Sequence, residues 1–463
     1  MTEQLKLKLN DSKATRWGAL VIVAFTMMAA YYVNDVVAPL KTMLETDLAW
    51  SSTDFGFFTG GYSFLNVFFL MLIWGGLILD RFGIRFTGKL ATILMVGGTA
   101  LEYYAMTGLA GADATLFGIN EILGYKTGVF VAFAGYSIFG VGAEVAGITV
   151  SKIIAKWFKG KELATAMGVQ VALARIGSQA GYAVAIPLAR AFGISTPVLL
   201  GLVLLLGGMI AFFVFAVMDK KLDKQMEAAA IAAGTEDEEE KFSFKDVKNI
   251  LVNPGFWLIA LLCVLFYSCV FPFQKFASEL MIIKYGINEN VAGTFAGLPA
   301  LGALILTPVF GGFIDKRGKS ASIMLLGSAM LICVHFIYAI PDINYWLVAI
   351  VLMIILGIAF SLVPSAMWPA VAKIFPVSQL GTAYALIFFI QNIGLWGIPT
   401  LIGWVLDAYC ISGKKPDGTN MYDYTVPMCI FTGIACLSLI VALLLKKADK
   451  KYGYKLEEPN IQK

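Results

Sequence analysis

Charged residues are scarce in this sequence. Asp, Glu, Lys and Arg make up 14% of its 463 residues, whereas hydrophobic residues make up 59%. In typical soluble domains about 25% of all residues are charged. The composition therefore excludes a set of ordinary soluble domains. With a mean hydropathy of +0.78, it indicates a chain surrounded largely by lipid.

Residues that build metal and catalytic centres are also scarce. There is one histidine, His335, and the six cysteines show no C-x-x-C or His–Cys spacing. We therefore expect no metal site and no cofactor. No nucleophile–base constellation is present, so an enzyme is not expected either. No short apolar segment of the signal-peptide kind precedes the first long apolar run.

Long apolar runs are abundant. A helix needs about 20 residues to cross the hydrocarbon layer of a membrane, and only helices or closed barrels satisfy backbone groups in lipid. The runs are continuous and do not alternate as barrel strands do, so we predict an all-α membrane protein with twelve transmembrane helices. The runs lie near 17–38, 54–79, 88–108, 127–154, 162–189, 194–218, 254–282, 291–314, 319–340, 345–372, 379–406 and 424–445.

The positive charges are distributed unevenly between the connecting segments. If the N-terminus is cytoplasmic, the inward segments hold 27 Lys and Arg residues and the outward segments hold 6. Such a bias fixes the orientation of a multi-pass protein, so both termini are predicted to be cytoplasmic. Topology thus accounts for these lysines and arginines, and no nucleic-acid partner is expected.

A polar interruption divides the twelve runs into two sets of six. We predict an N-terminal six-helix bundle over 1–218, a cytoplasmic linker over 219–253, a C-terminal bundle over 254–446 and a cytoplasmic tail over 447–463. The linker carries an acidic run at 236–240.

The two halves resemble each other in sequence. GGLILDRFG, from Gly75, recurs as GGFIDKRG from Gly311. ELATAMGVQVALARIG, from Glu162, aligns with QLGTAYALIFFIQNIG from Gln379. A duplicated six-helix half is typical of transporters that rock two bundles about a site near the membrane midplane.

The segment 75–85, G-G-L-I-L-D-R-F-G-I-R, resembles the loop motif of the major facilitator superfamily between its second and third helices. Together with the twelve runs and the duplication, it identifies the chain as a member. The resemblance implies a fold of two pseudo-symmetric six-helix bundles. We expect the glycine to let helices approach, the aspartate to cap a helix or pair with a neighbour, and the basic residues to anchor at the cytoplasmic face. The residues with this gating and topology role are Gly76, Asp80, Arg81, Arg85, Asp315 and Lys316.

Two opposite charges lie at one depth in the first half. Glu144 precedes Lys156 by 12 residues and Arg175 follows Glu162 by 13. At the rise of an α-helix, the two residues lie about 18 and about 20 Å from the cytoplasmic helix ends. Charged residues near the middle of a membrane usually face the bundle interior or a wet cavity, and they mark substrate sites.

A structural ion pair between the fourth and fifth helices is the simpler interpretation of Glu144 and Arg175. The repeat argues against it, because the second half has Ser361 and Asn392 at the equivalent positions. The fold therefore does not require the charges. A zwitterionic cargo fits them, since arginine offers a planar fork to a carboxylate and glutamate offers an anion to an ammonium group.

Other polar residues in the apolar runs are secondary candidates. Core packing explains Tyr62 and Asn66 as well as substrate contact does, and helix–helix hydrogen bonding is the alternative for Gln391 and Asn392. Prolines in the runs near 272 and 364–369 predict broken or kinked helices that gate. Lys275 and Glu279 are interpreted as a solvated i,i+4 pair near the outer surface. The remaining candidates are Trp368 for substrate binding, and Asp35 and Glu102 for proton coupling.

A narrower resemblance covers roughly 17–446. The segments WFKGKELATAMGVQVALARIGS, YSFLNV, DRFGIR, VFPF, WPAV and QLGTAY…QNIG resemble the lysosomal dipeptide transporter branch of the superfamily, the family of major facilitator superfamily domain-containing protein 1. This resemblance implies a dipeptide carrier, a uniporter in that family. By the same resemblance, Glu144 would meet the free amine of the peptide and Arg175 its free carboxylate.

The chain departs from that branch in its targeting features. No acidic dileucine signal appears in the polar N-terminus, and the single N-x-S/T sequence, Asn10–Ser12, lies on the cytoplasmic side. Outward loops therefore carry no glycan sites. We predict a monomer in a prokaryotic inner membrane, with a lysosomal membrane as the alternative. We expect no accessory glycoprotein subunit, and the partners are membrane lipid and a small-molecule substrate.

Two other functions fit the same sequence. An organic-anion/proton symporter of this fold would use Arg175 as the anion anchor and Glu144 as the proton-coupling acid. A non-transporting membrane scaffold would act through the linker over 219–253.

Overall fold

The structure is a computed structural model that describes residues 8–111, 114–158, 161–233 and 244–459. It is 83% helical. The acidic run at 236–240 lies outside the described residues. The division into bundles, linker and tail remains a prediction, although helix α7 extends to Ala233 and α15 to Tyr452, beyond the boundaries expected from hydropathy.

The first half contains seven α-helices, a short 3₁₀ turn and a small hairpin. The helices follow the predicted apolar runs, with short additional elements in the connections. Their bounds are α1 Lys13–Val36, η1 Ala38–Leu40, α2 Lys41–Asp47, α3 Ser52–Phe68, α4 Met71–Thr107, β1 Glu121–Ile122, β2 Tyr125–Lys126, α5 Thr127–Trp157, α6 Leu163–Phe192 and α7 Thr196–Ala233.

The second half contains eight α-helices and a second hairpin. Its bounds are α8 Phe244–Val252, α9 Pro254–Tyr285, α10 Glu289–Ala296, α11 Leu298–Arg317, α12 Ser320–Ala339, α13 Trp346–Ile374, α14 Val377–Tyr409, β3 Ile411–Lys414, β4 Asn420–Tyr422 and α15 Thr425–Tyr452.

Local sequence sets several helix starts. Ser51 and Asp54 form a capping box that begins α3, each side chain bonding the other residue's backbone N–H, which satisfies two otherwise unpaired donors. Asn253 caps α9, and Pro254 occupies the first turn, where a missing N–H costs nothing.

The second span is broken, and the break occurs at residues that we did not predict. Helices α3 and α4 meet at an angle of 58°, with Leu70 in the left-handed region at φ 53°. Within α4, Gly83 has φ 74° and separates two helical stretches. Glycine adopts this conformation without steric cost, and it lies inside the 75–85 motif.

The two helices predicted to be broken or kinked at prolines are not broken. Helix α9 continues through Pro272, and α13 continues through Pro364 and Pro369. A proline removes one backbone donor, but neighbouring helices and Ser or Thr side chains can accommodate the change in a membrane bundle.

Nine of the helices in the described residues are long and apolar enough to cross a membrane, or ten if the bent pair α3–α4 counts as one span. Helix α6 has 30 residues, a length similar to that of the candidate spans, and Gly83 divides α4 into two helical stretches. The helices of the described residues are therefore consistent with the twelve-helix fold.

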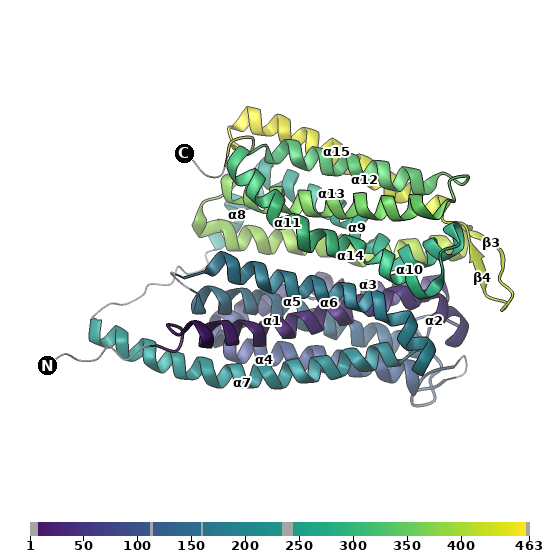
Figure 1. The fold of residues 1–463 in the computed structure, drawn as a ribbon, viewed down its shortest axis with the longest axis horizontal. Coiled ribbons are helices and arrows are strands. Elements are labelled where there is room, and N and C mark those ends of the chain that lie inside the picture. Colours follow the sequence, from purple (N-terminus) through teal and green to yellow (C-terminus); the bar gives the residue numbers. More distant parts are fainter. Residues whose placement is uncertain (1–7, 112–113, 159–160, 234–243, 460–463) are drawn as a thin grey trace.

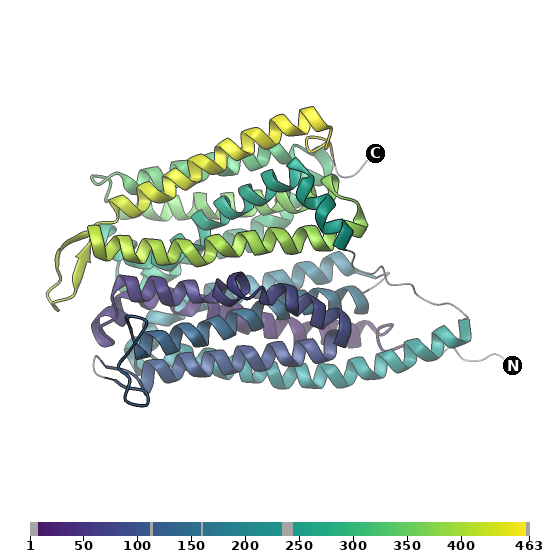
Figure 2. The ribbon, with the colours of Figure 1, turned by 180° about the vertical axis from the view of Figure 1, so that it is seen from behind.

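The helices form two layers. Figure 1 shows α1–α7 in one layer and α9–α15 in the other. The start of α1 and the end of α15 lie at one end of the molecule, which we call the termini side. Helix α2 and the β3–β4 hairpin lie at the opposite end, the hairpin side. The view from behind shows α14 leading into that hairpin (Figure 2).

On the hairpin side the two halves touch through their backbones. A Cβ at Gly403 of α14 would lie 2.3 Å from the carbonyl oxygen of Ser52, and one at Gly56 of α3 would lie 2.4 Å from the carbonyl oxygen of Pro399. Only glycine allows so close an approach. The hairpin side is therefore closed in this conformation.

On the termini side, the ion pairs lie within one half. Arg16 of α1 pairs with Glu162 at 2.8 Å, and Lys156 of α5 pairs with Asp219 of α7 at 2.7 Å. Where the structure describes both side chains, the hydrogen bonds and ion pairs that join the halves lie on the hairpin side.

Candidate functional site

Glu144 lies on α5 and is half-buried. Its carboxylate accepts a hydrogen bond of 3.0 Å from the hydroxyl of Tyr62 on α3. The Tyr62 ring packs 5.7 Å from that of Tyr136 and 6.2 Å from that of Phe139, both on α5. A close contact between the helices, in which a Cβ at Gly140 would lie 2.0 Å from the Tyr62 carbonyl oxygen, holds the two residues in register.

Arg175 lies on α6, and its guanidinium group is placed between aromatic rings from both halves. It lies 5.5 Å from the ring of Tyr31 on α1 and 4.9 Å from the ring of Phe360 on α13. The cation therefore faces the interface between the halves.

The two charges do not form an ion pair with each other. Glu144 is bonded to Tyr62, and Arg175 has no carboxylate within 4.0 Å among the described residues. The simpler interpretation, a structural ion pair joining the fourth and fifth helices, is therefore wrong for this conformation. An arginine held only by aromatic rings keeps its donors available for a ligand.

The second half contributes an aromatic wall beside Arg175. The rings of Phe271 on α9 and Phe360 on α13 are 5.3 Å apart, and Tyr267 stacks on Phe271 at 5.4 Å. Sequence analysis missed this wall and Tyr31. Aromatic residues are common throughout the chain, so no local signal distinguished these from packing residues.

Three of the other predicted substrate residues make contacts within the second half. Trp368 packs 4.9 Å from Phe388, Gln391 accepts a bond from the Cys263 thiol, and Asn392 donates to a carbonyl one turn away. These contacts lie within the second half and do not involve Glu144 or Arg175. Asn66 is buried, and neither of its amide atoms has a hydrogen-bond partner in the described part of the chain.

The 75–85 motif makes the contacts expected of a helix anchor. Asp80 pairs with Lys152 of α5 at 3.0 Å, and Arg85 pairs with Asp223 of α7 at 2.6 Å. The close helix approach occurs at Gly75, where a Cβ would lie 2.4 Å from a Val145 methyl group.

The other four motif residues are half-buried or exposed. A Cβ at Gly76 would meet nothing within 4 Å, so the expectation that Gly76 provides the close approach is wrong. Arg81 lies 5.5 Å from the ring of Phe82. In the second half, Asp315 is half-buried and Lys316 is exposed near the end of α11.

The interpretation of Lys275 and Glu279 as a solvated pair is also wrong. Both residues are buried, and each bonds across to the first half. Lys275 bonds Asp35 of α1 at 3.2 Å, whereas Glu279 bonds Lys41 of α2 at 2.5 Å. The spacing i,i+4 is equally compatible with two separate contacts, because both side chains lie on the face of α9 that meets the other half.

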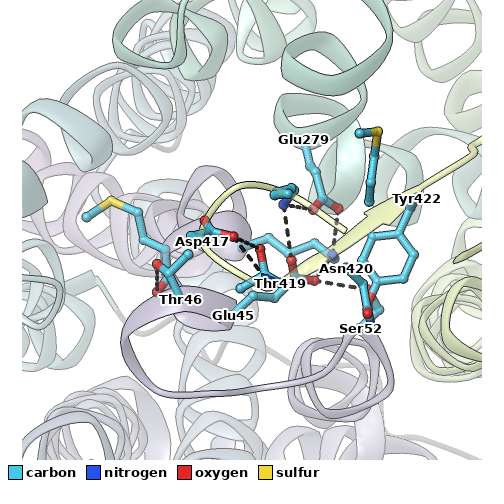
Figure 3. A network of polar contacts seen from close by, with 12 residues as sticks. Glu45, Thr46, Ser52, Glu279, Asp417, Thr419, Asn420 and Tyr422 are labelled. Carbon is cyan, nitrogen blue, oxygen red and sulfur yellow. Dashed lines mark hydrogen bonds and ion pairs between the residues drawn. The ribbon is translucent and has the colours of Figure 1, made fainter. Parts of the chain in front are cut away.

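A buried ionic cluster closes the hairpin side. Lys41 lies 2.5 Å from both Glu45 and Glu279, and Lys415 lies 3.6 and 3.7 Å from the same two carboxylates. Figure 3 shows Glu279 and Glu45 on opposite sides of the amino groups. The Ser52 hydroxyl donates to Glu45 at 3.1 Å. Separating these buried charges from one another costs several kcal/mol unless water or new partners replace the lost contacts.

The segment after the β3–β4 hairpin completes the cluster. The Tyr424 hydroxyl donates to Glu279, and burial, with the carboxylate of Glu279 beside it, raises the pKa of the Tyr424 phenol well above its ordinary value. The Lys41 amino group lies 4.7 Å from the ring centre of Tyr422. A cavity of about 190 Å³ adjoins the cluster, between Glu45 and Lys414.

The two predicted proton-coupling acids differ in environment. Asp35 pairs with Lys275 and accepts a bond of 2.6 Å from Ser178. Glu102 of α4 is completely buried, and neither carboxylate oxygen has a hydrogen-bond partner in the part of the chain that the structure describes. His335 is buried and packs against the rings of Phe273 and Phe431.

The fold and site together define a multi-pass membrane transporter built from two helical halves. A profile of the Major Facilitator Superfamily matches residues 20–399 and 272–458. The chain belongs to this superfamily, which confirms the fold and the resemblance predicted from sequence.

Curated relatives narrow the similarity. The chain is 29% identical over 454 residues to the human lysosomal dipeptide transporter MFSD1, an alignment that covers 95% of this chain and 88% of that protein. It is 27% identical over 441 residues to the zebrafish (Danio rerio) protein of the same name, covering 93% and 86%. These relatives are named as lysosomal, so they do not support the predicted prokaryotic membrane.

Solved structures share the fold at much lower identity. A crystal structure of the nucleoside transporter NupG has a TM-score of 0.68 at 12% identity, covering 92% of this chain and 98% of that one. A D-xylose-proton symporter has a TM-score of 0.64 at 15% identity, covering 93% and 97%.

Proposed function

We propose that the chain transports small zwitterionic peptides, dipeptides foremost, by alternating access of its two halves. The observation that carries the proposal is the separation of Glu144 and Arg175: opposite charges on adjacent helices that are bonded to other groups and not to each other. The names of the curated relatives support a dipeptide as the cargo.

In this proposal Glu144 binds the peptide's ammonium group and Arg175 its carboxylate. Arginine can donate two parallel hydrogen bonds to a carboxylate. Because the Arg175 guanidinium contacts Phe360 of the second half, a ligand bound to it would lie between the halves. That position allows the halves to close over the ligand from either side.

Transport in proteoliposomes tests the proposal. Vesicles containing the protein and loaded with unlabelled dialanine should take up radiolabelled dialanine by exchange. Free alanine or succinate in place of the unlabelled dipeptide should compete poorly. Exchange of succinate without exchange of dialanine would contradict the proposal and favour an organic-anion carrier.

Tyr62 is expected to position Glu144. Tyr62→Phe removes the hydroxyl that donates to the carboxylate and keeps the ring contacts with Tyr136 and Phe139. We expect dipeptide affinity to fall about tenfold, since a hydrogen bond to a charged group contributes roughly 1.5–3 kcal/mol. Calorimetric titration would measure the change, and an unchanged Kd would show that the bond does not position the acid.

If transport is linked to protons, Glu102 is the acid that we propose for coupling. A buried carboxyl group without partners is costly in the charged form, and Glu102 has none in the described residues. Glu102→Gln should keep dipeptide exchange but lose accumulation driven by an imposed pH gradient. Accumulation equal to that of the wild type would exclude this role, and a wild type that ignores the gradient would identify a uniporter.

Orientation and location belong to the same proposal. The distribution of Lys and Arg supports a cytoplasmic termini side. The absence of N-x-S/T sequences from the outward segments favours a prokaryotic inner membrane, whereas the relatives' names favour a lysosomal one. We propose a monomer that needs no accessory glycoprotein.

A further inference from the structure

Lys275 inserts its amino group into a set of oxygen atoms in the opposite half. Lys275 is on α9, and its Nζ lies 2.6 Å from the carbonyl oxygen of Asn34, 3.2 Å from Asp35 Oδ1 and 3.4 Å from the hydroxyl of Tyr136. We call the first-half residues Asn34, Asp35, Tyr136 and Ser178 the Asp35 socket. The socket thus binds a positive charge that the second half supplies.

Bonds within the first half hold the socket in place. Tyr136 donates to the Asn34 carbonyl at 2.8 Å, Ser178 donates to Asp35 Oδ2 at 2.6 Å, and the Asn34 amide donates to Asp35 Oδ1 at 2.8 Å. None of these bonds involves Lys275. The oxygen atoms should therefore keep their arrangement when Lys275 moves away.

Lys275 must leave the socket when the hairpin side opens. The contact joins α9 to α1 and α5 and lies with the other contacts between the halves. Tyr136 precedes Glu144 by eight residues on α5, about 12 Å along the helix. Ser178 follows Arg175 by three residues on α6, so the socket adjoins the proposed cargo site and lies on its hairpin side.

We propose that the Asp35 socket binds a monovalent alkali cation, with Na⁺ as the probe, when Lys275 has withdrawn. The inference rests on the proposed alternating access. Carboxylate, carbonyl and hydroxyl oxygens are ligands for hard cations, and the single carboxylate balances one positive charge. A proton in place of a metal cation would bind one carboxylate oxygen of Asp35, and the other oxygen atoms of the socket would have no positive charge to coordinate.

Lys275 and the cation would exclude each other. In the conformation described here the Lys275 amino group occupies the socket. The same amino group also interacts electrostatically with Glu102. A cation that binds only the state without Lys275 shifts the population toward that state. Na⁺ on the hairpin side would thus favour the hairpin-open conformation without being required for cargo binding.

Lys275→Ala should make the socket available in every conformation. The purified variant should be thermally stabilised, by roughly 2 °C, when NaCl replaces choline chloride at constant ionic strength. The double variant Lys275→Ala/Asp35→Asn should lose this response. Lys284→Ala is a matched control, because Lys284 lies on the same helix and, within the described residues, donates its hydrogen bonds to the carbonyls of Tyr338 and Ile340 and not to the socket. It should show no sodium response.

A second variant keeps the test valid if Lys275→Ala does not fold. Gly403→Leu separates α3 and α14 at the hairpin side without touching the socket, and Na⁺ should stabilise it over choline. The absence of a sodium response in both variants, or stabilisation by acid pH in place of Na⁺, would overturn the inference. Dialanine binding is measured on the same samples, so failure of the cargo proposal would be seen separately.

Discussion

Replacing Arg175 with alanine is expected to abolish dipeptide binding. The guanidinium group is the only cation that the proposal assigns to the peptide carboxylate, and two charge-assisted hydrogen bonds contribute roughly 3 kcal/mol or more. Affinity should therefore fall roughly 100-fold or more. Calorimetric titration with dialanine would measure the loss, and exchange in proteoliposomes should fall to background.

The same substitution should change stability little. Because Glu144 is bonded to Tyr62 and not to Arg175, removing the arginine does not leave a carboxylate without its partner. The loss should be about 1 kcal/mol, from the ring contacts with Tyr31 and Phe360.

Arg175→Lys is the matched control. It keeps the charge but loses the planar fork, so it should restore only part of the affinity. Dialanine binding by Arg175→Ala with a Kd near that of the wild type would contradict the assignment.

Replacing Gly403 with leucine is expected to prevent closure of the hairpin side. A Cβ there would lie 2.3 Å from the Ser52 carbonyl oxygen and 2.9 Å from Gly56 Cα, and backbone atoms cannot yield as a flexible side chain does. Overpacking of this kind destabilises a state by about 1–3 kcal/mol, and here it affects only the state in which the hairpin side is closed. Exchange should fall roughly tenfold or more, while dialanine binding in detergent remains within about threefold of the wild type.

The matched control lies six residues away on the same helix, roughly 1.7 turns. A Cβ at Gly397 would meet nothing within 4 Å, so Gly397→Leu should transport at nearly the wild-type rate. Equal loss in both variants would mean that the defect comes from glycine replacement in α14 and not from the contact between α3 and α14.

The fold could be predicted from sequence because lipid leaves few alternatives. Continuous apolar runs must form helices, and the repeat of the 75–85 motif near 311 predicts two related halves. Details of helix bending were less accessible. The prolines at 272, 364 and 369 lie in continuous helices, whereas the second span breaks at Leu70, an apolar residue that gives no local signal.

The charged pair of the site could be predicted, but its surroundings could not. Counting residues from the helix ends placed Glu144 and Arg175 at one depth. The partners of both side chains, Tyr62, Tyr31 and Phe360, depend on how helices from both halves pack, which no spacing within one helix encodes. Tyr62 was a candidate for substrate contact, and its bond to Glu144 supports the positioning role that we propose for it.

The contacts between the halves were the hardest part to predict. Lys275 and Glu279 have the spacing of a surface pair, and the sequence does not reveal that each has an opposite charge in the other half. Lys41 and Glu45 lie in the short helix α2, in a segment that the sequence analysis treated as a connection between two spans. Buried ionic groups of this kind come from tertiary structure, since burying them is favourable only when the partners are in place.

One measurement tests the central claim most directly: thermal stabilisation of the purified wild-type protein by dialanine, N-acetyl-dialanine and dialanine amide. If Glu144 and Arg175 bind the two peptide termini, free dialanine stabilises the protein, and each blocked peptide, which lacks one charge, does not at the same concentration. Equal stabilisation by all three peptides would contradict the account.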